Sequence, residues 1–325
     1  MNTRESFGVS IVIPAYNEEQ GIRETLEEVE SIASNLHIPT EVIIVNDGSL
    51  DRTAEIVSEF SFVTLVSHPI NIGYGNTLKT GIVYARFDWI CIFDSDGTYP
   101  IDQIPRLLKE MENGFDMVIG QRSNTHDHDV LLKRISRWLF VKFASVLSGH
   151  SIVDPNSGLR IFKKSMVLEF WGYLCGTFSF TTGLTVIAFQ KPYFVKFLPI
   201  SYRKRKGKSK VNHFFDSMLA IQLILQGISY YNPFKVIILI ANFLIFGIGL
   251  PAMVLASIGV HTLSLYYLAV TCTLTIVFAL AIVSFVIRAS VRDIHNDGRH
   301  KRGRLEQKGT VFHPVDRTSS VKNTP

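Results

Sequence analysis

The segment Trp89–Pro100, WICIFDSDGTYP, joins a strand pattern to a pair of acids. Its first five residues, WICIF, form an apolar run as long as one buried strand, and Asp94 and Asp96 follow at once. Side chains two residues apart on an extended chain point to the same side, so the two carboxylates can converge on one point. Because like charges repel and each carboxylate is costly to desolvate, the pair needs a cation or water beside it.

Two interpretations of this acid pair are open. Asp and Gly are common turn residues, so Asp94 and Asp96 can simply end the strand in a solvated turn. Magnesium and manganese ions, however, take oxygen ligands and are typically held by one or two carboxylates together with substrate phosphates. Because the acids lie at a strand end, the sequence favours a site for a divalent cation.

Strand and helix patterns alternate through the first 120 residues. The strand patterns are VSIVIPAY (9–16), TEVIIVNDGS (40–49), FVTLVSHP (62–69), WICIFDSDG (89–97) and DMVIGQRS (116–123). Amphipathic or glycine-led helix patterns separate the first four of them, so the sequence predicts an α/β fold with a mostly parallel sheet flanked by helices. Ligands of such sheets bind at the carboxyl ends of the strands, and that edge would carry Tyr16 to Glu18, Asp47, and the acid pair.

Asp47 follows an apolar strand in VNDGSLDRT (45–53). Its carboxylate can accept hydrogen bonds from a nucleobase edge or a ribose. The alternative is a turn followed by a helix cap, for which Asp51 is well placed. The next motif, NIGYGNTLKTG (71–81), lacks both the Walker spacing and the dinucleotide fingerprint, which excludes those two kinds of phosphate loop.

A second feature is the 52-residue run from Val236 to Ile287, which contains no Lys, Arg, Asp or Glu. A bilayer crossing needs about 20 apolar residues, so residues 233–288 predict two transmembrane helices, about 234–258 and 264–287. A buried helical hairpin of a soluble protein is the alternative. Basic residues flank the run on both sides and none lies in the turn, so both flanks and both termini are expected in the cytoplasm.

Two further segments have the composition of interfacial helices. Residues 129–149 place a basic side beside an apolar one and fit either a headgroup-level helix or an ordinary core-facing helix. Residues 212–232 are strongly apolar with aromatic residues at both ends, and adjoin the predicted spans. The basic tail, 289–325, is expected to be disordered. The catalytic unit would then be residues 1–211.

Six motifs occur in the order seen in family 2 glycosyltransferases. They are SIVIPAYNEE, VNDGSLDRT, NIGYGNTLKTG, IFDSDGTYP, DPNSGLRIF and YRKRKGKSK. The chain resembles the branch of dolichol-phosphate mannose synthases and bacterial polyprenyl-phosphate glycosyltransferases, over roughly residues 8–212 and with a C-terminal membrane hairpin in addition. The resemblance implies the nucleotide-sugar-binding α/β fold called GT-A.

The resemblance also implies roles for particular residues. The nucleotide pocket would be lined by Pro14, Ala15, Tyr16, Glu18, Asp47 and Asp94. Asp94 and Asp96 would form the Asp-x-Asp pair that bridges Mg²⁺ or Mn²⁺ to the donor diphosphate. The phosphate-binding groups would be Arg122, Arg160, Arg205, Lys208 and Lys210, and Ser157 would contact the acceptor phosphate. The catalytic residues would be Asp94, Asp96, Arg122 and Arg160. Where the family commonly has Gln, this chain has Thr98, a poorer candidate for the third metal ligand that water can replace.

The residues from Phe170 to Phe215 point to the chemistry of the acceptor. These 46 residues contain no Asp or Glu and eight Lys or Arg. A sugar hydroxyl needs a carboxylate base to become a nucleophile, whereas a lipid phosphate is already an anion and needs cations to hold it in line. The alternative is that the segment is only the basic flank of the membrane spans. A base from Asp127, Asp129 or Asp154 also stays open.

The sequence therefore predicts a metal-dependent, inverting glycosyltransferase at the cytoplasmic membrane face. Its substrates would be a UDP- or GDP-linked hexose-type sugar and a polyprenyl or dolichyl monophosphate. A homotetramer is a candidate assembly. The net charge of +5 is assigned to the membrane flanks and not to nucleic acid, because no nucleic-acid motif accompanies it. The alternatives are a polysaccharide or lipid glycosyltransferase with a hydroxyl acceptor, and a non-catalytic membrane scaffold.

Overall fold

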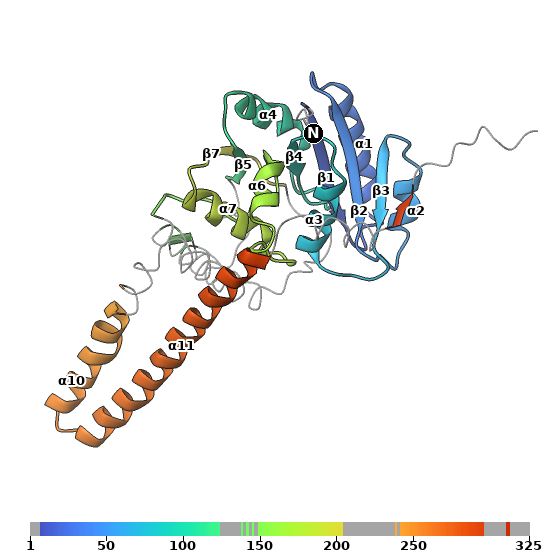
Figure 1. Ribbon diagram of the computed structural model, residues 1–325. Helices are drawn as coiled ribbons and strands as arrows, with labels where there is room; N and C mark the ends of the chain where they lie inside the picture. Colours follow the sequence, from blue (N-terminus) through green and yellow to red (C-terminus); the bar gives the residue numbers. More distant parts are fainter. Residues whose placement is uncertain are drawn as a thin grey trace, which may run out of the picture.

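The computed structural model describes residues 7–123, 138, 141–142, 145, 149–203, 238, 241–295 and 310–312. Its centre is one sheet with the strand order β7-β5-β6-β4-β1-β2-β3-β8 (Figure 1). The strands are β1 Val9–Ala15, β2 Thr40–Asn46, β3 Val63–Ser67, β4 Trp89–Ile92, β5 Met117–Arg122, β6 Arg160–Lys163, β7 Val195–Ile200 and β8 Thr310–Phe312.

Helices cover both faces of this sheet, as the sequence predicts. In the α/β unit they are α1 Ile22–Ser34, α2 Thr53–Ser58, α3 Tyr74–Tyr84, the 3-10 turn η1 Ile101–Gln103, α4 Ile104–Glu112, α6 Lys164–Glu169 and α7 Phe180–Gln190. Residues of α1, α2 and α4 form one apolar layer with the sheet, and residues of α3, α6 and α7 form the other. In β1, Ile11 and Ile13 belong to the first layer and Val12 to the second. A sheet buried on both faces produces the continuous apolar runs seen in the sequence.

The strand directions place four strand ends together. The pairs β1–β2, β1–β4 and β2–β3 are parallel, so the carboxyl ends of β1 to β4 meet at one edge of the sheet. Strand β5 is parallel to β7, whereas β6 runs antiparallel between β4 and β5. The α/β prediction is therefore confirmed, with an antiparallel strand inserted beside β4, the strand that carries the acid pair at its end.

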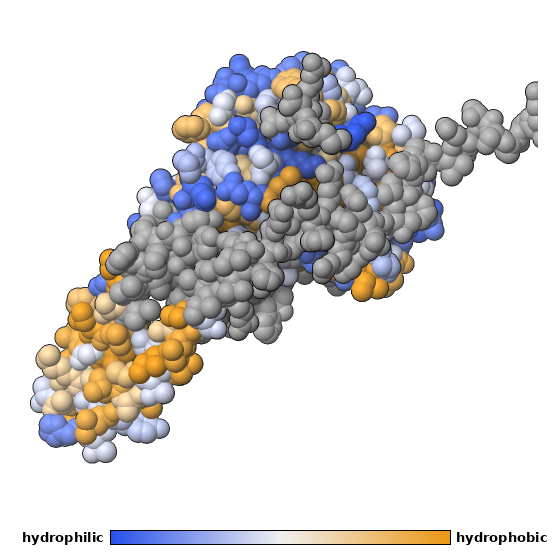
Figure 2. Space-filling model, viewed as in Figure 1, coloured by the Kyte–Doolittle hydropathy of each residue, from blue (hydrophilic) through white to orange (hydrophobic). Residues whose placement is uncertain are grey.

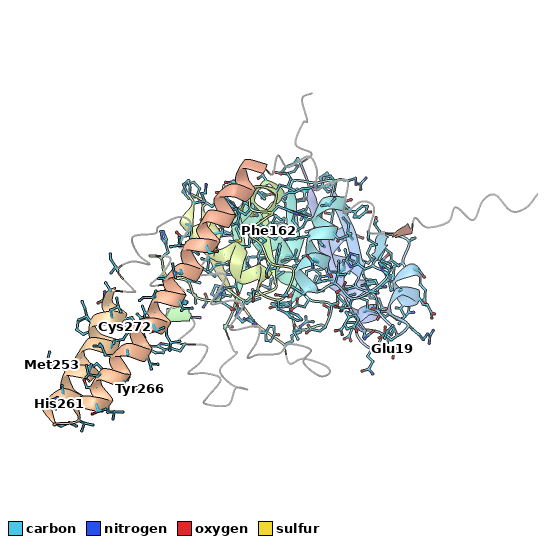
Figure 3. All side chains as sticks on the ribbon, turned by 60° about the horizontal axis from the view of Figure 1, so that its bottom comes forward. Glu19, Phe162, Met253, His261, Tyr266 and Cys272 are labelled. Atoms are coloured by element: carbon cyan, nitrogen blue, oxygen red, sulfur yellow. The ribbon has the colours of Figure 1, made fainter. Side chains whose placement is uncertain are left out.

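A helical hairpin extends away from the α/β unit (Figure 1). Its first arm is the π-helix η3 Phe243–Gly249 continued by α10 Leu250–Ser257, and its second arm is α11 His261–His295. Two hydrogen bonds join the arms: Ser264 Oγ donates to Ala252 O and Tyr267 OH donates to Gly247 O, both at 2.7 Å. Apolar side chains predominate on the face of the hairpin seen in Figure 2, and Figure 3 shows Met253, His261 and Tyr266 at its far end.

The two predicted transmembrane helices have different support. Among the described residues, one helix is long and apolar enough to cross a bilayer: His261–Leu280, with a mean hydropathy of 2.0 and 11% of its residues buried. The apolar segment Phe243–Ser257 in the first arm is shorter. Two crossings therefore stay a prediction, as does the tetramer. The second arm continues beyond the predicted end at residue 287 as an unbroken helix to His295.

The C-terminal tail differs from its prediction at one place. Thr310–Phe312, expected to be disordered, forms β8 and pairs antiparallel with β3 at the edge of the sheet. The physical reason is that Thr-Val-Phe has high β propensity and an edge strand offers unpaired backbone groups. The predicted helix at 212–232 lies outside the described residues, as does most of the one at 129–149.

Candidate active site

The acid pair lies at the carboxyl edge, two and four residues after β4 ends at Ile92. Asp94 is partly buried and Asp96 is 7% exposed. Tyr74 OH donates a hydrogen bond of 2.8 Å to Asp94 Oδ1. A Cβ atom at residue 158 would lie 3.1 Å from both carboxylate oxygens of Asp94, so the backbone of Gly158 packs closely beside this carboxylate. The Tyr74 side chain of α3 and the backbone of the loop before β6 thus lie beside Asp94.

Thr98 lies beside Asp96 and is fully buried. Its backbone N–H and its hydroxyl both donate to Asp96 Oδ1, at 3.1 and 2.6 Å. This geometry orients the Asp96 carboxylate, and a role of Thr98 as third metal ligand stays a prediction. Within the described ranges, no group of three or more His, Cys, Asp or Glu side chains could hold a metal ion. Asp94 and Asp96 stay the predicted metal ligands.

Asp47 is 3% exposed and accepts hydrogen bonds from three protein groups. The Nδ1 atom of His68 is 2.8 Å from Asp47 Oδ1, Ile72 N donates to the same oxygen at 3.0 Å, and Gly73 N donates to Oδ2 at 2.9 Å. Burial alone would raise the pKa of Asp47, but these hydrogen bonds outweigh it and hold that pKa below its ordinary value. The carboxylate predicted to contact a nucleotide is largely engaged in holding the loop after β3.

The residues predicted to line a nucleotide pocket lie where β1 ends. Pro14 and Ala15 are buried, whereas Tyr16 and Glu18 are partly buried in the loop that follows. This loop is joined to the loop after β2: Asn17 N donates to Ser49 Oγ at 2.9 Å and Glu18 N donates to Thr53 Oγ1 at 2.8 Å. Figure 3 shows Glu19, the next residue, at the periphery of the α/β unit. The two loops form one connected rim at the carboxyl edge.

Gly48 shows why this rim needs a glycine. Its φ of +68° is in the left-handed region, and a Cβ there would lie 2.5 Å from the backbone of Ile70. Because a side chain at residue 48 would collide with backbone, the loops after β2 and β3 approach this closely only with glycine.

Arg122 forms an ion pair with Asp154. Its Nε and Nη2 donate to the two carboxylate oxygens at 2.8 and 2.7 Å, and its guanidinium lies 5.4 Å from the ring centre of Tyr202. Burial acts to raise the pKa of Asp154, but Arg122 lowers it by more, so this pKa lies below its ordinary value. The predicted role of Arg122 in phosphate binding therefore competes with this internal partner.

Arg160 and Ser157 are fully buried and face the interior. Arg160 donates to the carbonyl oxygens of Pro155, Ser157 and Thr181 and to the hydroxyl of Thr185. Burial lowers the pKa of this guanidinium to about 10. Ser157 Oγ donates to Gly120 O at 2.5 Å. The predicted phosphate contacts of these two residues are not supported by their positions, because their donors hold the loop before β6 together.

The remaining predicted phosphate groups, Arg205, Lys208 and Lys210, lie outside the described residues. The chain that leads to them is described as far as Arg203, whose backbone N donates to Thr98 O at 2.8 Å. The basic segment therefore begins next to the acid pair. Sequence reasoning missed His68 and Tyr74, which contact Asp47 and Asp94, because only the folded chain brings these residues together.

A doubly covered α/β sheet with an Asp-x-Asp pair at its carboxyl edge defines the GT-A class of glycosyltransferase folds. Residues 10–171 match the model of glycosyl transferase family 2, and the chain belongs to this family.

Several curated proteins are similar to this chain. A low-salt glycan biosynthesis hexosyltransferase of Haloferax volcanii is 29% identical over 78% of this chain and 60% of its own length. A dolichyl-phosphate hexose transferase of the same organism is 28% identical over 63% of this chain and 87% of its own length. An undecaprenyl-phosphate 4-deoxy-4-formamido-L-arabinose transferase of Pseudomonas fluorescens is 32% identical over 49% of this chain and 48% of its own length. The chain thus spans less than two thirds of the first and third of these relatives.

Solved structures share the fold. Glucosyl-3-phosphoglycerate synthase from Mycobacterium tuberculosis, in complex with Mn²⁺, UDP-glucose and phosphoglyceric acid, matches with a TM-score of 0.57 and 18% identity. The match covers 68% of this chain and 80% of that one. At this identity, the likeness concerns the fold alone.

Proposed function

We propose that this protein transfers a hexose-type sugar from a UDP- or GDP-linked donor to a polyprenyl monophosphate, with inversion at the anomeric carbon. The observation that carries the proposal is the acid pair at the carboxyl edge of a family 2 domain. The names of the similar curated proteins support the acceptor class, because two of the three relatives described above are dolichyl- or undecaprenyl-phosphate transferases.

Two described carboxylates are poor candidates for the base that a hydroxyl acceptor needs, and the other candidates from the sequence, Asp127 and Asp129, lie outside the described residues. A hydroxyl must lose a proton to a base, and a useful base has a pKa near neutral pH. Asp47 and Asp154 instead have pKa values held below their ordinary range by hydrogen bonds and by Arg122. A lipid phosphate needs no base, since it is an anion at neutral pH, and its attack opposite the leaving diphosphate inverts the anomeric carbon.

Asp94 and Asp96 fit a small divalent cation by their donor chemistry. Carboxylate oxygens suit Mg²⁺ and Mn²⁺, which keep several positions for water and substrate phosphates. Hydrogen bonds from Tyr74 and Thr98 orient the two carboxylates. When bound, the cation would stabilise negative charge on the leaving nucleoside diphosphate.

The hairpin supports attachment to a membrane with both flanks on one side. Its arms reverse direction between Ser257 and His261, and the chain returns to the α/β unit, where β8 pairs with β3. An inserted hairpin would therefore have the α/β unit at both of its ends. The basic residues on both flanks favour the cytoplasmic face.

The direct test is sugar transfer by the full chain purified in detergent. A panel of radiolabelled UDP- and GDP-sugars is offered with undecaprenyl or dolichyl phosphate and Mn²⁺, and we expect labelled lipid and free nucleoside diphosphate. Asp96→Ala should abolish transfer. Asp102→Ala, an exposed acid six residues further on, is the matched control and should keep full activity.

Three results would contradict parts of the proposal. Full activity in excess chelator would exclude the metal. Transfer to a hydroxyl acceptor but not to a polyprenyl phosphate would favour the other enzyme class. Nucleotide affinity without release of nucleoside diphosphate in the presence of acceptor lipid would favour a non-catalytic scaffold.

A further inference from the structure

Tyr74 is the first residue of α3 and the direct hydrogen-bond donor to the acid pair. We propose that Tyr74 is a positioning residue that fixes the Asp94 carboxylate for the metal, and that Asp47 and His68 fix Tyr74 in turn. This inference rests on the proposed function, because it assumes that Asp94 is a metal ligand.

The hydroxyl and the ring of Tyr74 are each held by a different partner. The hydroxyl donates to Asp94 Oδ1 at 2.8 Å. The ring stacks on Phe178, with ring centres 5.2 Å apart and an angle of 20° between the planes. The phenol is the donor in this hydrogen bond, because an ionised carboxylate can only accept.

The backbone before Tyr74 is held by Asp47. The two N–H groups that the Asp47 carboxylate accepts belong to Ile72 and Gly73, the residues immediately before Tyr74. The Nδ1 atom of His68 is hydrogen-bonded to the same carboxylate, and its Nε2 atom lies 3.0 Å from Thr80 Oγ1 on α3. The side chains of Asp47, His68 and Thr80 are buried, so the start of α3 cannot shift without breaking hydrogen bonds in the protein interior.

The loop that carries Phe178 packs against the first turn of α3. Asn76 N donates to Gly176 O at 3.1 Å, and a Cβ at residue 75 would lie 2.4 Å from Cys175 O. Tyr74 is thus set between the end of β2, the end of β4 and the loop before α7. A chain of contacts runs from His68 through Asp47 and the backbone of Gly73 to Tyr74 and Asp94.

A hydrogen bond to one oxygen of a ligating carboxylate decides how the group is turned toward its metal. Loss of such an outer partner typically weakens metal binding by about 10–100-fold. We therefore expect Tyr74→Phe, which keeps the ring and its stacking on Phe178, to weaken Mn²⁺ binding by a factor in this range.

The experiment measures Mn²⁺ binding by the full chain from the electron paramagnetic resonance signal of free Mn²⁺, with UDP and with GDP in separate titrations. Tyr193→Phe is the matched control, because Tyr193 OH donates to Glu169 Oε2 in the same kind of bond away from the acid pair. Its Mn²⁺ affinity should stay within about 2-fold of the wild type. Circular dichroism and the thermal midpoint check that each variant is folded.

The outcomes separate this inference from the function it rests on. Failure of the wild type to bind Mn²⁺, or binding that survives Asp96→Ala, would remove the proposed metal site itself. A wild type that binds Mn²⁺ beside a Tyr74→Phe variant of equal affinity would overturn only the role of Tyr74. The nucleotide affinity of Tyr74→Phe, measured in excess chelator, can also fall by the same factor as its Mn²⁺ affinity. That result would show that the substitution loosens the whole site, and it would overturn the role of Tyr74.

Discussion

A guanidinium in a protein interior needs an acceptor for each nitrogen, and Arg160 finds carbonyl oxygens for all three of its own. Lysine has one nitrogen and cannot reach the same acceptors. We expect Arg160→Lys to leave buried carbonyls unpaired and to lose about 3 kcal/mol of stability. In scanning fluorimetry of the detergent-solubilised chain, this loss would lower the thermal midpoint by roughly 6–12 °C.

The control for Arg160 is Arg106, an exposed arginine with one hydrogen bond of 3.3 Å to Pro199 O. Arg106→Lys should move the midpoint by about 1 °C at most, since exposed substitutions rarely exceed about 0.5 kcal/mol. An Arg160→Lys variant as stable as the wild type would contradict the supporting role and return Arg160 to the phosphate-binding candidates.

The sequence predicts the location of Asp94, Asp96 and Asp47, because each follows an apolar run and strand ends meet at one edge. It does not predict which way Arg160 faces. A basic residue in a motif can turn outward to a ligand or inward to carbonyls, and only the packing of α7 against the loop before β6 decides between them. Tyr74 gives no local signal either, since its partner lies twenty positions away.

Helix α3 shows how a contact between elements can reverse a local preference. Alanine normally stabilises a helix by about 1 kcal/mol relative to glycine. At Gly75, however, a Cβ would lie 2.4 Å from Cys175 O and 2.8 Å from Thr177 O, both backbone atoms. We expect Gly75→Ala to lower the thermal midpoint, because α3 must move away from that loop, and to weaken Mn²⁺ binding by displacing Tyr74.

Gly183 in α7 is the matched helical glycine. A Cβ there would meet only Leu174 Cδ2, at 3.7 Å, which is an ordinary contact. Gly183→Ala should therefore leave the midpoint unchanged or raise it slightly, with Mn²⁺ affinity unaltered. If both variants behave alike, the close approach at residue 75 does not control the position of α3.

At the scale of elements, the first four strands follow from the sequence because each is an apolar run bounded by turn residues. Strand β6 does not follow. It is four residues long, begins with the buried Arg160, and exists as a strand because β4 and β5 pair with it on either side. Strand β8 depends in the same way on the open edge of β3. Pairing partners distant in sequence leave no pattern in a short segment.

At the scale of the whole molecule, composition identifies the hairpin but not how it meets a membrane. The 52 residues without charge specify apolar helices, and the structure adds that Ser264 and Tyr267 bond the two arms together. Polar groups paired within the hairpin need no water, which suits an apolar surrounding. The apolar segment of the first arm, Phe243–Ser257, is however shorter than the roughly 20 residues that a bilayer crossing needs.

Cysteine labelling tests the arrangement of the hairpin in a membrane. In a chain whose three cysteines are replaced by alanine, Val260→Cys marks the exposed turn and Gln20→Cys marks the exposed rim of the α/β unit. If both arms cross, a membrane-impermeant maleimide should label residue 260 only in right-side-out vesicles and residue 20 only in inside-out vesicles. The reason is that a hairpin with both ends at the α/β unit must place its turn on the opposite face. Detergent-opened vesicles, in which both sites should react, provide the control. Labelling of both sites from the same side would mean that the hairpin lies on one face of the membrane or on another protein, and would contradict two crossings.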